Sequence, residues 1–429
     1  MAVFFLAAYL ISILVRPMDW WEPLLGYELV TVGAVLILLV GFPQLLARFP
    51  VLWKRVPQLK VAIGFLLAIS VSLVARAWFG GALDVFVIFG KVIIFYFLII
   101  LLVKTVDDLN LLIWAFLVCA LWLAVHAIMQ HHLGYGFGGQ EPLFRRIDPT
   151  KGTNVYQAMA YGTFSDPNDL SAALVVAIPL FITQFYRKNF LLKAASFIGI
   201  PLVAYGIYCT NSRGGVVAFG GMLLTFIMAR LKGVSRYLVI ILAVVGVTVA
   251  APSRFVSSST EGHDRAILWG QGLDMFKGNP IFGIGSGNFA NTSEGHNVAH
   301  NSYVHTLAET GLLGYIPFFL IIYLTIVQLR RLLALKNLIP KSDFVLLTGL
   351  YAGLTGYLTG VYFISRQYQH ILYVFLGLAA AGVYVVSERN GLRDRIFGST
   401  QNNLRVGLMY SLGSIVVIWI LIRLANLVS

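Results

Sequence analysis

Long apolar runs alternate with short polar connections along nearly the whole chain. Most of these runs approach or exceed the roughly 17–25 residues that a helix needs to cross about 30 Å of hydrocarbon. A backbone inside a bilayer must pair its own polar groups, and a helix does so within one segment. The pattern therefore predicts an all-α, polytopic transmembrane helical bundle of about 12–13 spans. The apolar runs cover residues 1–15, 24–47, 60–76, 82–103, 109–131, 169–186, 194–210, 214–230, 237–251, 302–328, 343–364, 370–387 and 406–427.

The connections form two alternating sets, and one set holds most of the 31 Lys and Arg residues. Basic residues concentrate in short cytoplasmic loops, so we predict that this set and the N-terminus face the cytoplasm. With thirteen spans, the C-terminus would face outward. We interpret the first run as a retained span, because it has no basic region before it and no small-residue cleavage site. The basic set comprises the connections at residues 48–60, 104, 187–193, 230–236, 330–341 and 389–405.

Two outward connections, at about 132–168 and 252–301, are much longer than the others. The cytoplasmic connections are all short, which leaves no cytoplasmic domain that could hold a nucleotide. We therefore expect a single integral membrane domain over residues 1–429 whose polar chemistry lies on the outer face.

Composition agrees with this prediction. Only 11% of the residues are charged and 59% are hydrophobic, whereas about a quarter of a typical soluble domain is charged. A net charge of +13 would suggest a nucleic-acid partner for a soluble protein, but here the charge follows the connections, so we expect no nucleic acid. Cys119 and Cys209 lie in apolar runs without CxxC or zinc spacing and are expected to be buried free thiols.

The segment HNSYVHTLAETGLLGY, residues 300–315, carries the first candidate chemistry. His300 lies where the second long connection meets a helix, and a neutral imidazole there can take a proton from a hydroxyl. Asn301 is a candidate to orient a substrate or to cap the helix. We expect Glu309 on nearly the same helix face as His300 and close to His305. The alternative is that His300 acts only as a cap or as an anchor at the bilayer interface.

The segment TNSRGGVVAF, residues 210–219, places Arg213 at the outer face between Ser212 and two glycines. Glycines let the backbone approach a ligand while the guanidinium makes a bidentate contact to phosphate. The alternative is that Arg213 extends to lipid headgroups and the glycines serve close helix packing.

Two further segments border the long connections. The periodicity around Arg265, Trp269 and Phe276 predicts a short amphipathic helix on the membrane surface. The GIGSGNF stretch after this helix matches a phosphate-binding loop only weakly, so we interpret it as a flexible turn. Asp166 with Pro167 predicts a helix start, so Asp166 and Asn168 are candidates for capping or for substrate contact.

The histidines of the second connection do not predict a metal site. His296, His300 and His305 are spaced by four and five residues, but the chain contains neither HExxH nor Asp-x-Asp. HExxH is the motif expected of a zinc protease, and Asp-x-Asp is the motif expected to bind a divalent cation on a nucleotide-sugar. We therefore expect no metal and no other cofactor.

Together these motifs resemble the O-antigen ligase and O-antigen polymerase superfamily of bacterial inner membranes, with the ligases favoured. His300-Asn301, followed after nine residues by Gly311 and after two more by Gly314, is similar to the ligase signature. Ser212-Arg213-Gly214 resembles the family's Ser-Arg-Gly motif. The thirteenth helix departs from the roughly twelve expected of a ligase. Weaker similarities are carried by Arg265 with Trp269, by Pro280, Gly283 and Gly285, and by Asp166-Pro167-Asn168.

The resemblance implies a membrane-embedded, GT-C-like glycosyltransferase of lipopolysaccharide biosynthesis, with its active site and both long connections on the periplasmic side of the inner membrane. It implies a glycan on undecaprenyl diphosphate as donor, and lipid A–core oligosaccharide or another glycan as acceptor. Arg213 and Arg265 would stabilise the leaving diphosphate without a metal, and His300 would be the base of an inverting displacement. The expected substrate-binding residues are Asn301, Asn168, Asp166, His305, Glu309 and Ser212.

Three alternatives remain open from the sequence. A polymerase would pass the glycan to a second lipid-linked repeat unit, and a protein O-glycosylating relative would pass it to a protein. A secondary transporter or channel would also explain the many spans, but it predicts ionisable residues near the bilayer midplane. Lys91 is the main such residue in this chain.

Overall fold

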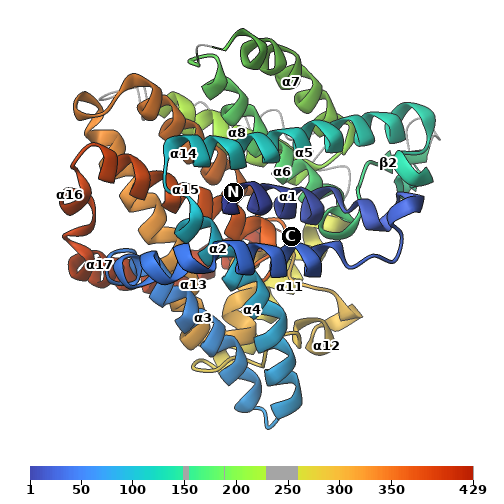
Figure 1. Cartoon of the computed structure of the whole chain (residues 1–429). Helices are drawn as coiled ribbons and strands as arrows, with labels where there is room; N and C mark the ends of the chain where they lie inside the picture. Colours follow the sequence, from blue (N-terminus) through green and yellow to red (C-terminus); the bar gives the residue numbers. More distant parts are fainter. Residues whose placement is uncertain (148–153, 188, 229–258, 429) are drawn as a thin grey trace.

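The computed structural model describes residues 1–147, 154–187, 189–228 and 259–428, which form a bundle of helices (Figure 1). The predicted span at 237–251 lies outside the described residues. The same holds for residues 148–153 of the first long connection and 252–258 of the second.

Ten helical segments within the described ranges are long and apolar enough to cross a membrane. They confirm the prediction of an all-α, multi-pass membrane protein. Two further predicted runs coincide with α8 (Arg213–Met228) and α14 (Lys341–Gly360). The ten candidates are α1 (Ala2–Val15) continued by η1 (Pro17–Asp19), α2 (Leu29–Arg55), α3 (Pro57–Val74), α4 (Phe79–Leu102), α5 (Val106–Leu133), α6 (Pro167–Gln184), α7 (Phe190–Cys209), α13 (Ser302–Ala334), α15 (His370–Arg389) and α16 (Arg393–Phe397) continued by α17 (Thr400–Val428).

The helices α6 and α15 form the centre of the bundle. In the most apolar part of each helix, 89% of the residues of α6 and 94% of those of α15 are buried, whereas only 11% are buried in α2 at the periphery. The helix α14 packs closely against α6 and α8 through a row of glycines. A Cβ at Gly349 or Gly353 would collide with Thr183 or Val176, so only glycine permits this approach.

Local signals in the sequence explain where individual helices begin and end. At the start of α5, the Thr105 hydroxyl accepts a hydrogen bond from Asp108 N at 3.1 Å, and the Asp108 carboxylate accepts one from Thr105 N at 3.0 Å. This reciprocal capping box pairs two donors that the helix leaves open. The same helix ends at Gly134, whose φ of 80° suits glycine.

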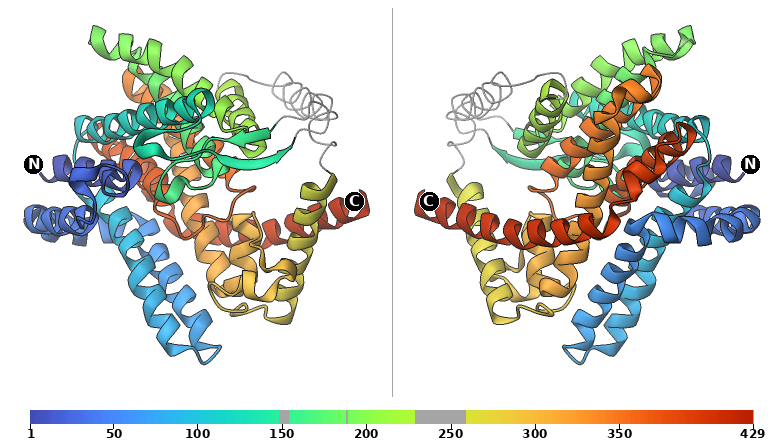
Figure 2. Two further views of the ribbon diagram at one scale, coloured as in Figure 1. Left: turned by 90° about the vertical axis from the view of Figure 1, so that its right-hand side faces the viewer. Right: turned by 90° about the vertical axis from the view of Figure 1, so that its left-hand side faces the viewer.

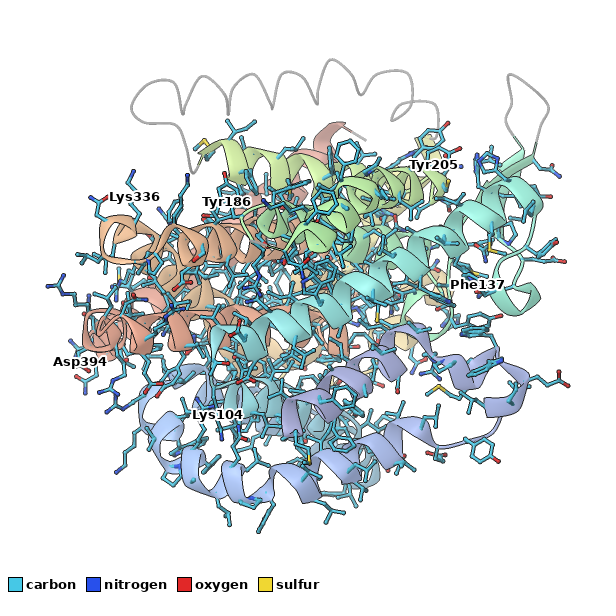
Figure 3. The ribbon with its side chains drawn as sticks, turned by 45° about the horizontal axis from the view of Figure 1, so that its top comes forward. Lys104, Phe137, Tyr186, Tyr205, Lys336 and Asp394 are labelled. Atoms are coloured by element: carbon cyan, nitrogen blue, oxygen red, sulfur yellow. The ribbon has the colours of Figure 1, made fainter. Side chains whose placement is uncertain are left out.

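Those connections of the basic set that the structure describes gather at one end of the bundle. Figure 3 shows Lys336 and Asp394 at this end, and Phe137 and Tyr205 at the opposite end. The helix α5 runs between the two ends, from the Lys104 side to the Phe137 side. This arrangement is the one that the alternating charge pattern requires.

The first long connection contains a β-hairpin that the sequence pattern does not predict. Strands β1 (Leu143–Ile147) and β2 (Asn154–Gln157) pair antiparallel, and Phe144 packs edge-on against Tyr156 across them. The strand β2 also bonds to the turn between α7 and α8, because the Asn211 side-chain amide donates to Tyr156 O at 2.9 Å. The hairpin is thereby held beside the start of α8.

The second long connection contains α11 (Ser259–Gly278) and α12 (Phe289–Thr292). The predicted helix around Arg265 is therefore present. It packs on α13 and α17 through an apolar cluster that includes Leu268, Leu273 and Ile418. In Figure 2, α11 and α13 lie in one projecting part of the molecule and the α3–α4 turn lies in another.

Candidate active site

The connection between α14 and α15, residues 361–369 (the 361–369 connector), contacts the start of α13. Ser302, the first residue of α13, donates its backbone N–H to Val361 O at 3.0 Å. Its hydroxyl donates to Ile364 O at 2.7 Å and accepts from Arg366 N at 2.8 Å. Ser302 is fully buried, so these bonds fix the end of α13 against the connector.

The same connector reaches the starts of α6 and α8. The Arg366 guanidinium binds Asp169, in the first turn of α6, with Nε–Oδ2 at 2.7 Å and Nη2–Oδ2 at 2.5 Å. At the start of α8, a Cβ on Gly214 would lie 3.3 Å from Phe363 Cβ. The N-termini of α6, α8 and α13 therefore converge on one short segment.

This convergence gives the site its electrostatic character. The backbone N–H groups at a helix start lack partners within the helix, and the helix dipole places roughly half a positive charge there. Helix N-termini are common binding sites for phosphate for this reason. Three of them meet beside Arg213 and Arg366. Side-chain caps already accept from several of these N–H groups, so it is the helix dipoles and the guanidinium groups, and not open N–H donors, that favour an anion.

Side-chain caps join the starts of α6 and α8. Asp166 Oδ1 accepts from both Asn168 N, at 2.7 Å, and Asn168 Nδ2, at 2.9 Å. Asn168 Oδ1 in turn accepts from the Ser212 hydroxyl at 2.6 Å, and Ser212 Oγ accepts from Gly215 N at 2.9 Å. The capping interpretation of Asp166 is confirmed, and Asn168 and Ser212 hold the two helices in register.

Arg213 is the first residue of α8 and follows this cap directly. The chain enters the helix through Asn211, whose φ of 48° lies in the left-handed region. A Cβ on Gly215 would come 2.3 Å from Ser171 Oγ and 2.6 Å from Ser171 Cβ. The glycine at 215 therefore permits α8 to lie against α6, and this contact fixes the direction in which α8 leaves Arg213.

His300 and Asn301 form the entrance to α13. Asn301 Oδ1 accepts from Tyr303 N at 3.0 Å and from Val304 N at 3.1 Å, which confirms its predicted capping role. His300 has a φ of 47°, a left-handed conformation that is uncommon for residues other than glycine. Backbone strain of this kind clusters at functional sites, where the surrounding structure holds it in place.

Helical periodicity does not relate Glu309 to His300. The helix α13 begins only at Ser302, so His300 precedes it. Nine residues also amount to two and a half turns, which would place the two on opposite faces of a helix. The expectation that they share a face is therefore wrong.

The helix α11 connects Arg265 to His300 through Trp269. Trp269 Nε1 donates to Ala299 O, the carbonyl before His300, at 2.8 Å. The indole also packs edge-on against Tyr362 of the connector at a centroid distance of 5.4 Å. Arg265 lies one helical turn before Trp269, on the same face of α11. The face of α11 that carries Arg265 thus faces the convergence of helix starts.

His305 and Glu309 form a second, deeper group. His305 Nε2 lies 3.0 Å from Glu309 Oε1, which confirms their predicted proximity. Phe289 N donates to Glu309 Oε1 at 3.1 Å, and the Tyr368 hydroxyl donates to Oε2 at 3.0 Å. Burial, and then the Glu309 carboxylate, raise the pKa of Tyr368 well above its usual value, so the phenol keeps its proton. The group borders a cavity of about 190 Å³, which Gln367 of the connector also lines.

The glycine-rich stretch after α11 is bonded to α13 where the sequence suggested a flexible turn. Gly311 has φ 57° and ψ −157°, which interrupts the helix. Across the break, Gly285 N donates to Glu309 O at 2.9 Å and Leu313 N donates to Ile281 O at 3.0 Å. A Cβ on Gly283 would lie 2.3 Å from the Glu309 backbone. The glycines of the predicted motif thus permit contact between two backbones.

The sequence leaves Arg366 open between a supporting and a catalytic role, and Asp169 was not predicted as a site residue. Burial opposes the charged form of Arg366, but the Asp169 carboxylate outweighs this effect, so the pKa of the guanidinium lies above its usual value. The polar run Ser365–His370 between two apolar runs was a sequence signal for this connector. Its partner in α6 lies 197 residues away, and nothing local indicates that pairing.

The structure thus divides the predicted residues into two groups. His300, Asn301, Arg213, Ser212, Asn168 and Asp166 occupy the three helix starts around the connector, with Arg265 on the adjoining helix. His305 and Glu309 lie farther along α13 and bond to each other. Within the described ranges, no group of three or more His, Cys, Asp or Glu residues is arranged to hold a metal ion.

Comparison with known proteins adds one family and no individual relative. None of the curated proteins compared matches the chain. Residues 198–319 match the family described as O-Antigen ligase. This segment includes the start of α8, the helix α11 and the first half of α13, which carry Arg213, Arg265 and His300. The match supports the placement of this chain in the O-antigen ligase superfamily.

Proposed function

We propose that this protein is a glycosyltransferase of the O-antigen ligase type. It transfers a glycan from undecaprenyl diphosphate to lipid A–core oligosaccharide at the periplasmic face of the bacterial inner membrane. The family match supports an enzyme that ligates or polymerises lipid-linked glycans. The donor, the acceptor and the periplasmic orientation are part of the proposal.

One observation carries the proposal: the N-termini of α6, α8 and α13 converge on the 361–369 connector, beside Arg213 and Arg366. A diphosphate is the most highly charged part of the donor, and it gains further charge as the glycosidic bond breaks. Preorganised N–H dipoles and guanidinium groups are the means by which a protein stabilises such charge. Arg213 and Arg265 are assigned to the diphosphate, and Arg366 positions the connector.

The proposed reaction is a single displacement. An acceptor hydroxyl attacks the anomeric carbon while the bond from that carbon to the diphosphate oxygen breaks, so the configuration inverts. His300 takes the hydroxyl proton, and undecaprenyl diphosphate leaves with the bonding electron pair. The diphosphate linkage supplies the free energy, so the reaction needs no nucleotide.

Two other functions differ in what they require of the site. A polymerase would use the same donor chemistry with a lipid-linked acceptor, and the resemblance of the His300, Gly311 and Gly314 spacing to ligases favours the ligase. A transporter would place ionisable side chains near the bilayer midplane. The buried pairs Asp169–Arg366 and His305–Glu309 instead lie within about two turns of a helix start. Lys91 in α4 is exposed on the outside of the bundle.

A reconstituted transfer assay tests the proposal. The purified protein receives an undecaprenyl-diphosphate glycan with lipid A–core, or the donor alone. We expect product on lipid A–core from the wild type, and a loss of about 10²–10⁴-fold in His300→Asn, the range that a general base contributes. Asparagine is the appropriate substitution because it tolerates the left-handed backbone of His300.

His296→Asn is the matched control. His296 is exposed in the same connection and has a φ of 54°, so the two variants change the same residue type in similar backbone. Equal losses in both variants would contradict the role of His300. Longer glycans on the donor without added core would identify a polymerase. If folded protein with authenticated donor gives neither product, the transferase proposal is wrong.

A further inference from the structure

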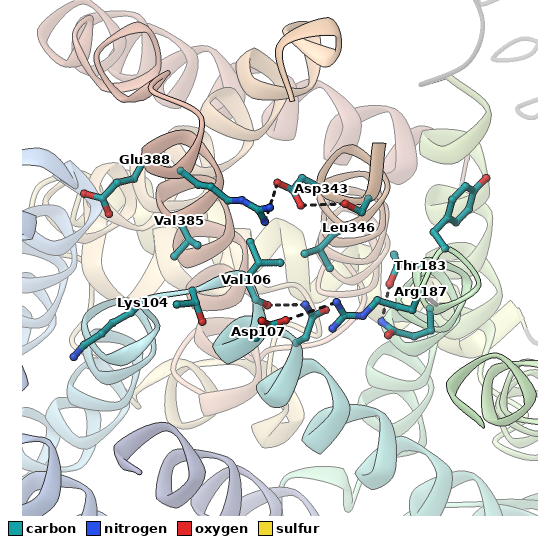
Figure 4. A pocket seen from close by; sticks show the side chains of 15 residues that line it. Lys104, Val106, Asp107, Thr183, Arg187, Asp343, Leu346, Val385 and Glu388 are labelled. Carbon is teal, nitrogen blue, oxygen red and sulfur yellow. Dashed lines mark hydrogen bonds and ion pairs between the residues drawn. The ribbon is translucent and has the colours of Figure 1, made fainter. Parts of the chain in front are cut away.

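A second cavity lies at the end of the bundle opposite to the candidate active site (Figure 4). It is formed where α5 and α14 begin and where α6 and α15 end, whereas the candidate site lies at the opposite ends of α6, α14 and α15. Its volume is about 470 Å³, within the range of roughly 300–1,000 Å³ that is common for small-molecule sites.

Its floor contains a buried carboxylate with an unused acceptor. Asp343 is 1% exposed, and within the described residues its Oδ2 has no hydrogen-bond donor. The Ser342 hydroxyl reaches only the other oxygen, at 3.4 Å. Other polar side chains of the floor are satisfied, as when Gln184 accepts from Trp114 Nε1 at 3.1 Å. The nearest cation to Asp343 Oδ2 is Arg389 Nη1 at 3.8 Å, which is beyond hydrogen-bond distance. A buried carboxylate held only by such a distant ion pair is incompletely compensated, so Asp343 Oδ2 can accept an N–H group from a ligand.

The rim supplies charges of both signs. Three acidic residues and three basic residues line the cavity, so its lining has no net charge: Asp107, Asp343 and Glu388 with Lys104, Arg187 and Arg389. The two arginines lie 3.8 Å from their nearest carboxylates, Asp107 for Arg187 and Asp343 for Arg389. Charge-assisted hydrogen bonds are shorter, about 2.7–2.9 Å, so a second anion can bind the guanidinium groups at closer range.

The helix dipoles at the cavity are balanced in the same way as the charged side chains. Two helices begin at the cavity and two end there, so positive and negative ends of helix dipoles both face it. A ligand with a primary ammonium and a phosphate matches both sets of charges. The ammonium supplies the N–H donors that Asp343 lacks, and Arg187 and Arg389 suit a phosphate.

We propose that this cavity binds the headgroup of a phosphoethanolamine lipid. A lipid is favoured over a soluble ligand because the cavity lies at the ends of helices that span the bilayer, where lipid headgroups lie. Leu346 and Val385 add an apolar part to its wall. By the predicted orientation, this end of the bundle faces the cytoplasm, so the lipid belongs to the cytoplasmic leaflet.

Native mass spectrometry of the full-length protein tests the proposal with three dioleoyl lipids. Phosphatidylethanolamine has a primary ammonium, phosphatidylcholine has no N–H donor, and phosphatidylglycerol has no cation. We expect phosphatidylethanolamine to bind at least about tenfold more tightly than the other two, the factor that one hydrogen bond to a charged group provides. Asp343→Asn removes this preference.

Asp394→Asn is the control, because Asp394 lies at the same end of the bundle and its side chain is 95% exposed. Arg187→Gln gives a second test at the rim, in case Asp343→Asn fails to fold, and it weakens phosphatidylethanolamine binding. Equal binding of the three lipids, or a preference that survives both variants of the cavity, would overturn the proposal. Competition by soluble glycerophosphoethanolamine at the same affinity as the lipid would overturn the lipid assignment.

Discussion

The ion pair between Asp169 and Arg366 should couple the stability of α6 to that of the 361–369 connector. Asp169 is 1% exposed, and the Arg366 side chain is 26% exposed. When one partner of a buried pair is removed, the remaining charge is uncompensated, at a cost of about 3–5 kcal/mol. Because Arg366 retains some contact with water, we expect Asp169→Asn to cost about 3 kcal/mol, at the lower end of this range.

Arg366→Gln should cost a similar amount, about 3 kcal/mol, because the fully buried Asp169 carboxyl left without its partner can take up a proton instead of remaining charged. The double variant leaves neither charge, so its cost should be lower than the sum of the single costs by about 2–3 kcal/mol. The measurement is the free energy of unfolding of the four proteins in mixed detergent micelles. The transfer assay on the same samples should show reduced activity in both single variants, because the pair holds two helix starts at the connector.

The control cycle uses Asp274 and Lys277, an exposed pair at 2.7 Å on α11. Exposed pairs contribute only about 0–1 kcal/mol, so each single variant and the coupling should stay within that limit. If the Asp169 and Arg366 substitutions are additive, or if their coupling equals that of the exposed pair, the argument that this pair organises the site fails.

Three further predictions concern close contacts around the site. Gly215→Ala should remove most transferase activity, because its Cβ would lie 2.3 Å from Ser171 Oγ. Gly220 in the same helix has open space around it, so Gly220→Ala should retain activity. The transfer assay compares the two variants. Gly311→Ala should destabilise the protein by at least about 1–3 kcal/mol, because Gly311 has a positive φ and its added Cβ would lie 2.5 Å from the Ile281 carbonyl. The control Gly413→Ala has open space and should be neutral or slightly stabilising. Equal melting temperatures of the two variants would contradict this reasoning. Trp269→Phe should keep the fold but lower kcat several-fold, because it loses the bond of about 1 kcal/mol to Ala299 O that fixes the entrance to α13; an unchanged kcat would show that this bond does not position His300.

Much of the bundle follows from local sequence signals. Apolar length and the requirement that membrane-embedded backbone pairs with itself determine that the chain forms spanning helices. Caps at Asp166 and Asn301 act within three residues, so the sequence predicts the starts of α6 and α13. The order of basic and apolar segments likewise predicts which connections gather at one end of the molecule.

The pairing of distant segments depended on the tertiary structure. Asp169 and Arg366 meet only because α14 packs against α6 and the connector that follows α14 reaches the start of α6, and no periodicity encodes a contact across 197 residues. From the sequence, Gly283 and Gly311 are interpreted as turn and packing residues. In the structure their lack of a Cβ matters because the backbone around Ile281–Gly283 touches the backbone around Glu309–Gly311. His300 could be identified as a candidate base from its sequence context, but its left-handed backbone and its link to α11 through Ala299 arise from packing. Local composition fixes which segments are helical, whereas side-chain packing between helices determines which of their ends meet.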